Sequence, residues 1–140
     1  MIAAALEISD ATLTTAGILL LTVVAVELGG LTVLRMTRGS QPATGFQKAF
    51  ARAGHAHAGV FVLFAIVAQL LVDAARLDGI DELIARDGIW VAAILFPAGF
   101  FLSSAGRGRT EPNRLIYLLY AGIVALTVGV VTLGIGLLAA

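Results

Sequence analysis

The chain has 140 residues, of which 59% are hydrophobic and 13% are charged, and its mean hydropathy is +1.00. Soluble domains carry roughly 25% charged residues, so this composition excludes an ordinary soluble protein and predicts an integral membrane protein with one domain, residues 1–140. The formal net charge of zero gives no indication of a nucleic-acid partner, and the lack of cysteine excludes disulfides and thiolate metal sites.

Four apolar stretches are long enough to cross a hydrocarbon core, which needs about 20 helical residues. They cover residues 11–34, 49–72, 89–105 and 115–138. Only helices satisfy their own backbone hydrogen bonds in lipid. We therefore predict an all-α polytopic membrane protein with four transmembrane helices in an antiparallel bundle. Pro97 lies within the third stretch and predicts a kink in that helix.

The charges of the joining segments predict the orientation. Residues 35–52 carry four basic side chains and no acid, and residues 106–114 carry three basic side chains and one acid. Residues 73–88 carry five acids and two basic side chains. Basic short loops stay in the cytoplasm, so we expect a multi-pass protein of the inner (plasma) membrane with both termini outside. The first stretch lacks the basic start of a signal peptide and is expected to be retained.

The acidic segment contains two turn signals, Asp78-Gly79 and Asp87-Gly88. They bracket residues 80–86, which we expect to form a short surface helix between the second and third spans. The basic segments contain side chains with long stems, which can extend from a helix end to the headgroups. The expected inner-surface anchors are Arg35, Arg52, Arg107 and Arg114.

Ionisable side chains within the spans are the strongest functional signal, because they are costly in lipid and mark paths, ligand sites or packing contacts. Glu27 is the acid of the first span, and His55 and His57 lie in the second. All three are expected roughly 10 Å from the cytoplasmic ends of their helices. Further polar residues are expected at the same level, so that all four helices form one polar layer: Ser103, Ser104, Tyr117 and Tyr120.

The helical period separates the two histidines, because residues two apart point about 200° away from each other. His55 continues into a stripe of small and polar residues that suits the bundle interior, which makes it the expected partner of Glu27. His57 continues through Phe61 and Phe64. We interpret that face as a contact with lipid or with another subunit.

One functional hypothesis is an ion- or proton-linked transport or channel protein, with Glu27 and His55 as the protonatable groups. Four helices enclose too little space for a wide pore, so this hypothesis requires a homo-oligomer, a dimer or larger. The acid of the first helix and the base eight residues later, Glu27 and Arg35, resemble the plan of small multidrug resistance transporters. The histidine pair departs from that plan, so the resemblance implies no substrate.

A second hypothesis is a protein that binds a metal ion or haem. His55-Ala56-His57 resembles the histidine pair in the main subunit of haem-copper oxidases. One ion held by His55, Glu27 and water or a tyrosine is chemically possible. The chain has two histidines in all, and a single helix cannot point both at one ion. A bis-histidine haem would therefore need a dimer.

A third hypothesis is a non-catalytic small subunit of a larger membrane complex, which contacts its partner through the face of His57, Phe61 and Phe64. No catalytic motif identifies a reaction, so an enzyme is not expected. The motif RAGHAHAG at residues 52–59, with its flank from residue 46 and residues 96–108 and 112–114, resembles that of small four-helix membrane proteins of high-GC bacteria. This resemblance implies four spans and a shared inner-side motif, and it implies no activity.

Overall fold

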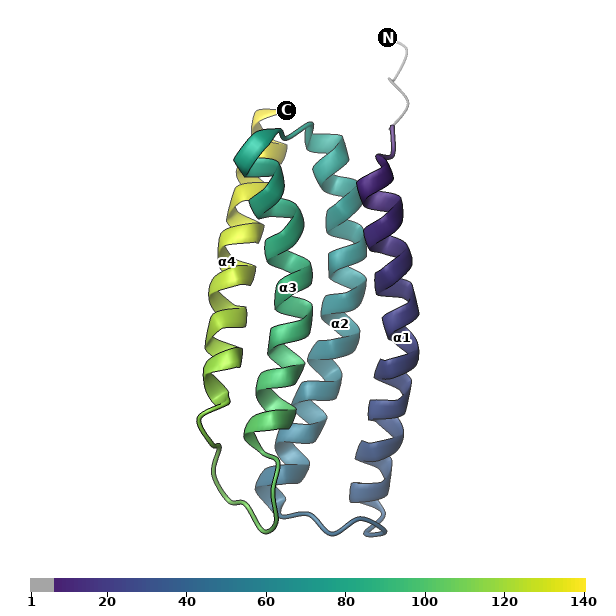
Figure 1. Cartoon of the computed structure of the whole chain (residues 1–140), viewed down its shortest axis with the longest axis vertical. Helices are drawn as coiled ribbons and strands as arrows, with labels where there is room; N and C mark the ends of the chain where they lie inside the picture. Colours follow the sequence, from purple (N-terminus) through teal and green to yellow (C-terminus); the bar gives the residue numbers. More distant parts are fainter. Residues whose placement is uncertain (1–6) are drawn as a thin grey trace.

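The computed structural model describes residues 7–140, which form four helices. These are α1 (Asp10–Thr37), α2 (Gly45–Ala75), α3 (Gly79–Ser103) and α4 (Ile116–Ala139). Each is long and apolar enough to cross a membrane, so the predicted all-α fold with four membrane-spanning helices is confirmed. The helices lie antiparallel along the long axis, as Figure 1 shows. The fold is thereby compatible with a multi-pass membrane protein.

The two ends of the molecule differ in which chain termini and connections they contain. The chain enters α1 and leaves α4 at one end, where the α2–α3 connection also lies; this is the terminal end (Figure 1). The α1–α2 and α3–α4 connections lie at the opposite end, the loop end. The basic segments identified in the sequence are thus both at the loop end.

Helix α3 differs from its prediction, which placed its start at residue 89. It begins at Gly79, ten residues earlier, and continues without a break through Asp87 and Gly88. The expected surface helix at 80–86 is therefore wrong as a separate element, because these residues are the first turns of α3. Gly88 tolerates this helical conformation and packs closely on α4, where a Cβ at residue 88 would lie 2.8 Å from the Ala125 carbonyl oxygen. The helix also continues through Pro97.

The helices form an open row rather than a closed bundle. Helix α2 packs on α1 and α3, α4 packs mainly on α3, and within residues 7–140 no backbone contact joins α1 to α3 or α4. Figure 1 shows the same order across the molecule, from α1 through α2 and α3 to α4. Much of α1 is consequently exposed on the surface, as its side chains Leu21 and Leu28 illustrate.

The tightest contact joins α3 to α4 through small residues, which let helix backbones approach where lipid offers no hydrophobic drive. A Cβ on Gly99 would lie 2.5 Å from the Leu119 backbone nitrogen, and one on Gly122 would lie 2.9 Å from the Phe96 ring. Phe96 and Leu119 are themselves buried in this contact. The α3–α4 hairpin is therefore the rigid part of the row.

At the loop end, the start of α2 is tied to the α3–α4 connection by side chains. Thr44 and Gln47 form a capping box, in which each side chain bonds the backbone N–H of the other residue. The Gln47 amide also donates to the carbonyl oxygens of Ser104, at 2.9 Å, and Gly106, at 2.7 Å. The Thr44 hydroxyl donates to the Arg109 carbonyl oxygen. One short motif thus caps α2 and ties its start to the α3–α4 connection.

Gly99→Ala is expected to lower the unfolding temperature of the purified protein. The added methyl group meets the α4 backbone, which cannot rotate away, and such overpacking costs about 1–3 kcal/mol. The matched control is Gly17→Ala, because a Cβ at Gly17 has no atom within 4 Å. Gly17→Ala should leave the temperature unchanged or raise it, since alanine favours the helix. Equal effects of the two variants would contradict the close α3–α4 contact.

Candidate functional site

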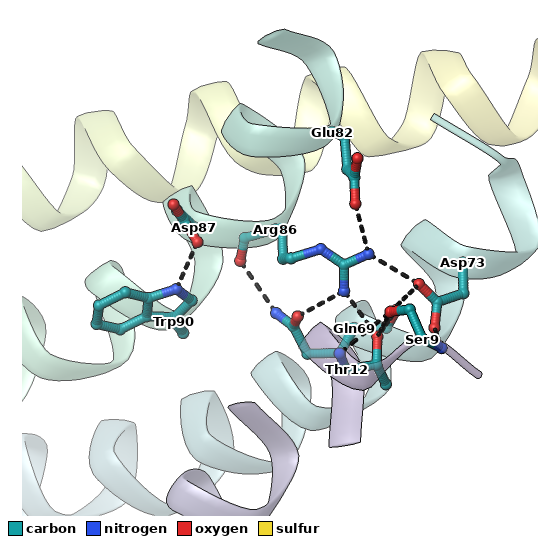
Figure 2. A network of polar contacts seen from close by, with 8 residues as sticks. All are labelled: Ser9, Thr12, Gln69, Asp73, Glu82, Arg86, Asp87 and Trp90. Atoms are coloured by element: carbon teal, nitrogen blue, oxygen red, sulfur yellow. Dashed lines mark hydrogen bonds and ion pairs between the residues drawn. The ribbon is translucent and has the colours of Figure 1, made fainter. Parts of the chain in front are cut away.

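The most buried polar cluster surrounds Arg86 of α3, near the terminal end (Figure 2). Arg86 is 8% exposed, and its guanidinium bonds side chains of α1 and α2. Its Nη2 donates to Asp73 Oδ1 at 2.8 Å and to Glu82 Oε1 at 2.9 Å. Its Nη1 donates to Gln69 Oε1 at 3.0 Å. One cation therefore faces two carboxylates and an amide in a buried setting, where such pairs are strongly coupled.

The same cluster fixes the start of α1. Arg86 Nη1 donates to Thr12 Oγ1 at 2.7 Å, and Thr12 is 1% exposed. Ser9, the N-cap of α1, donates to Asp73 from its backbone N–H at 2.9 Å and from its hydroxyl at 3.0 Å. We call Ser9, Thr12, Gln69, Asp73, Glu82 and Arg86 the arginine network. Three helices that otherwise form an open row are joined by it.

His55 occupies the contact between α1 and α2. A Cβ on Gly30 would lie 3.0 Å from His55 Cε1 and 3.2 Å from Nε2, and one on Gly29 would lie 3.8 Å from Nδ1. The two glycines of α1 thus leave the space that the imidazole fills. His55 is half-buried and also lines the hollows on both sides of this contact. The expected interior position of His55 agrees with this placement.

His57 lies on the other side of α2, against α3. Its ring stacks on Phe96 at a centroid distance of 5.5 Å and lies 5.2 Å from the ring of Phe100. Nδ1 lies 2.7 Å from the Ala53 carbonyl oxygen. Because a carbonyl oxygen only accepts, Nδ1 carries the proton, and Nε2 is the acceptor of the neutral ring. The expectation that this face contacts lipid or a subunit is wrong for His57, which packs inside its own chain.

The separation of α1 from α3 leaves a furrow over α2, with two parts. The first is an apolar groove of about 280 Å³ that includes His55 and runs past Trp90, Pro97 and Phe101 of α3. The second is a polar vestibule of about 740 Å³ at the loop end, lined by Gln47, Ser104 and Arg107 among others. Phe101 lines both parts, so they adjoin. Of the ionisable groups predicted within the spans, His55 is the one that lines the furrow.

The arginine network lies beyond the furrow, toward the terminal end. Trp90 lies one helical turn beyond Arg86 on α3, and its indole N–H donates to Asp87 Oδ1 at 2.8 Å, as Figure 2 shows. On α1, the groove extends to Ile18 and Leu19, and the buried Thr12 follows toward the terminal end. The furrow is therefore wider at the loop end, and bonded polar side chains join α1, α2 and α3 beyond its other end.

The other sequence-predicted site residues do not join one polar layer. Glu27 is exposed on α1, and the ion pairs of residues 7–140 involve Arg86, with none between Glu27 and His55. Ser103 and Ser104 are buried, but their hydroxyls bond the Phe100 and Phe101 carbonyl oxygens of their own helix. The two tyrosines, Tyr117 and Tyr120, are exposed and contact each other. The expected convergence of four helices at this depth is therefore wrong.

The expected anchors all lie toward the loop end. Arg35 is in the last turn of α1, Arg52 is exposed on α2, and Arg114 is exposed before α4. Arg107 lines the vestibule. Within residues 7–140, no group of three or more His, Cys, Asp or Glu side chains is placed to hold a metal ion. One ion on His55 and Glu27, and a haem between two copies, both stay predictions.

The arginine network was not predicted, because Arg86 lies in residues 80–86, which were interpreted as a short surface helix outside the spans. Two signals in the sequence point to it. Glu82 and Arg86 are four residues apart, the spacing of an ion pair on one helix face. Gln69 and Asp73 have the same spacing on the stripe that continues from His55. Together they place polar residues of two adjacent helices at the terminal end.

Arg86→Met is expected to destabilise the protein by about 3–5 kcal/mol, because removing one partner of a buried pair leaves uncompensated charge. Asp73→Asn should also destabilise it, and the double variant should lose less than the sum of the two single losses. Thermal unfolding in detergent measures all three. Asp81→Asn, at an exposed acid of the same α3 segment, is the control and should have little effect. Strict additivity would contradict direct coupling between Arg86 and Asp73.

Comparisons with protein-family models, curated proteins and solved structures returned no match to this chain. The resemblance of residues 52–59 to a motif of small bacterial membrane proteins therefore stays a prediction. The same holds for the resemblances to transporters and oxidases. The furrow and the arginine network are the features from which a function of this chain can be inferred.

Proposed function

We propose that the protein is a proton-linked membrane transporter in which the furrow between α1 and α3 is the substrate path. The loop end would face the cytoplasm, since its connections carry the excess of basic residues. The inner membrane is the expected location. His55 would carry the proton, and the arginine network would act as the outer gate.

The observation that carries this proposal is the asymmetry of the furrow. Its vestibule at the loop end includes polar side chains, whereas beyond its other end the network around Arg86 bonds α1 to α2 and α3. A transporter open to one side has this form, with a path to a midplane site and a barrier beyond it. Opening to the other side would separate α1 from α3, which are joined by the side-chain hydrogen bond between Thr12 and Arg86.

The network is a suitable barrier because it is strong and yet incomplete. Within residues 7–140, the Nε of Arg86 is buried and has no hydrogen-bond partner. A partly satisfied buried network is less stable than a fully paired one. Glu82 is also partly exposed, with 39% of its side chain accessible. Solvent at the terminal end can therefore compete for the guanidinium.

His55 is suited to couple a proton to this movement. It is the ionisable group in the lining of the groove, and an imidazole can both take up and release a proton. Its ring also fills the space against Gly29 and Gly30 of α1. A change of charge on His55 would thus alter the same contact that positions α1.

Glu27 supports assembly into a homo-oligomer. It is exposed near the middle of α1, on a surface otherwise formed by side chains such as Val24 and Leu28. An acid facing hydrocarbon is costly, so a polar group from another chain is expected to cover it. A second copy is the proposed partner. The same observation favours the alternative that the protein is a small subunit of a larger membrane complex.

Purified protein in liposomes is expected to move protons faster than protein-free liposomes do. An imposed membrane potential drives the flux, and an entrapped pH-sensitive dye measures it. His55→Gln should reduce the flux to the protein-free rate, because glutamine cannot change its protonation state. Glu27→Gln should reduce it at least partly. Thr127→Val, on the exposed surface of α4 away from the furrow, is the control and should retain full flux.

The transport proposal fails if wild-type protein moves neither protons nor alkali cations and Glu27→Gln has no effect in any assay. The size of the assembly in nanodiscs then tests the alternative that the chain is a small subunit of a larger complex. A larger complex that co-purifies with the chain from its native membrane, and is lost when Glu27 is replaced, would favour the subunit role.

A further inference from the structure

We propose that the furrow binds an anionic amphiphile with a single alkyl chain, of the fatty-acid class, with its chain in the apolar groove and its acid group in the vestibule. This inference names the substrate class of the transporter proposed above and rests on that function. The two parts of the furrow provide complementary chemistry for the two parts of such a molecule.

The groove suits an alkyl chain. On α1 its lining runs from Leu19 to Gly29, which corresponds to roughly 15 Å at 1.5 Å per residue. On α3 it is bounded by Trp90, Ile94 and Pro97, which offer apolar surface. The groove has a volume of about 280 Å³. It opens to the side of the molecule where Ile94 is exposed. A chain can therefore enter from the bilayer without crossing water.

The vestibule suits an anionic head. Arg107 lines it together with Gln41, whose amide can donate hydrogen bonds. Residues 35–52 and 105–114, which surround it, carry seven basic side chains and a single acid, Glu111. Arginine is well matched to a carboxylate because its N–H groups form a planar fork. The surrounding charge disfavours a cationic amphiphile and favours an acid.

His55 lies where the groove approaches the vestibule. On α2, Ala51 lines the vestibule, and His55 follows one turn later in the groove. A protonated imidazole at this position can donate a charge-assisted hydrogen bond to a carboxylate, and a neutral one cannot match that strength. Binding of the acid and protonation of His55 would therefore favour each other, which gives the proton coupling a physical basis.

The sequence provides an internal probe of this binding. Trp90 is the single tryptophan of the chain, and it lines the groove. It lies roughly 16 Å along α3 from Phe101, where groove and vestibule adjoin. Bromine atoms on a bound chain quench tryptophan at close range. An acid oriented as proposed should bring its methyl end, and not its carboxyl end, close to Trp90.

The test uses the full chain in nanodiscs of zwitterionic phosphatidylcholine, with trace amounts of stearic acid brominated either near the methyl end or near the carboxyl group. Strong saturable quenching of Trp90 by the first acid, and weak quenching by the second, is expected. The methyl ester and a brominated phosphatidylglycerol should quench no more than their partition into the bilayer requires. Arg107→Gln should weaken binding about tenfold, and Arg114→Gln, at an exposed site outside the vestibule, should not.

A second pair of variants distinguishes binding in the groove from partition of the brominated acid into the bilayer. Ala25→Phe places a ring in the groove from an exposed position and should abolish the saturable quenching. Val24→Phe, at the neighbouring exposed residue outside the groove, should leave it unchanged. Quenching that survives Ala25→Phe, equals that of phosphatidylglycerol, or is independent of bromine position would overturn the proposed ligand.

The ligand proposal and the transporter proposal can be contradicted independently of each other. If the acid binds as proposed and the liposome assay shows no flux, the transporter proposal is wrong while the ligand site stands. If His55-dependent proton flux is present and the acid does not quench Trp90, the ligand class is wrong while the transporter proposal stands.

Discussion

A buried guanidinium holds this row of helices together. Lipid offers no partner to a charge and little hydrophobic drive between helices, so polar groups must be satisfied within the protein. The two terminal nitrogens of Arg86 meet that requirement by bonding side chains of α1, α2 and its own helix α3 at once. Arg86 bonds α1 directly to α3, whose backbone α1 does not approach within the described chain.

The contrast between the two halves of the row follows from their residue types. Helices α3 and α4 meet through glycine and alanine, whose small size permits a close and rigid contact. Helices α1 and α3 are instead held apart, with side chains bridging them at the terminal end and His55 filling the space over α2. The separation creates the furrow. A molecule with a fixed hairpin and a loosely held first helix has one part that can move relative to the other.

Much of the fold could be predicted from hydropathy, because a span in lipid requires a long apolar helix whatever its neighbours are. The start of α3 could not, because Asp87-Gly88 has the composition of a turn, and close packing on α4 decides its helical conformation. The capping box of Thr44 and Gln47 carried a local signal that was available from the sequence.

The candidate site was harder to predict than the fold. Helical periodicity placed His55 on the interior face, since that depends on a single helix. It also assigned His57 to the periphery, because the pattern of one helix does not show which neighbour covers a phenylalanine face. Depth alone suggested that Glu27, the serines and the tyrosines would meet. Rotation about each helix axis decides whether they do, and this depends on contacts between distant segments.

The bridging of α1 by Arg86 also bears on how the protein is made. During synthesis, α1 and α2 both precede the residue whose guanidinium engages Thr12. Ser9 can bond Asp73 as soon as α2 is inserted, whereas the bond of Thr12 to Arg86 must wait for α3. The arrival of the arginine therefore completes a contact that α1 and α2 have already begun.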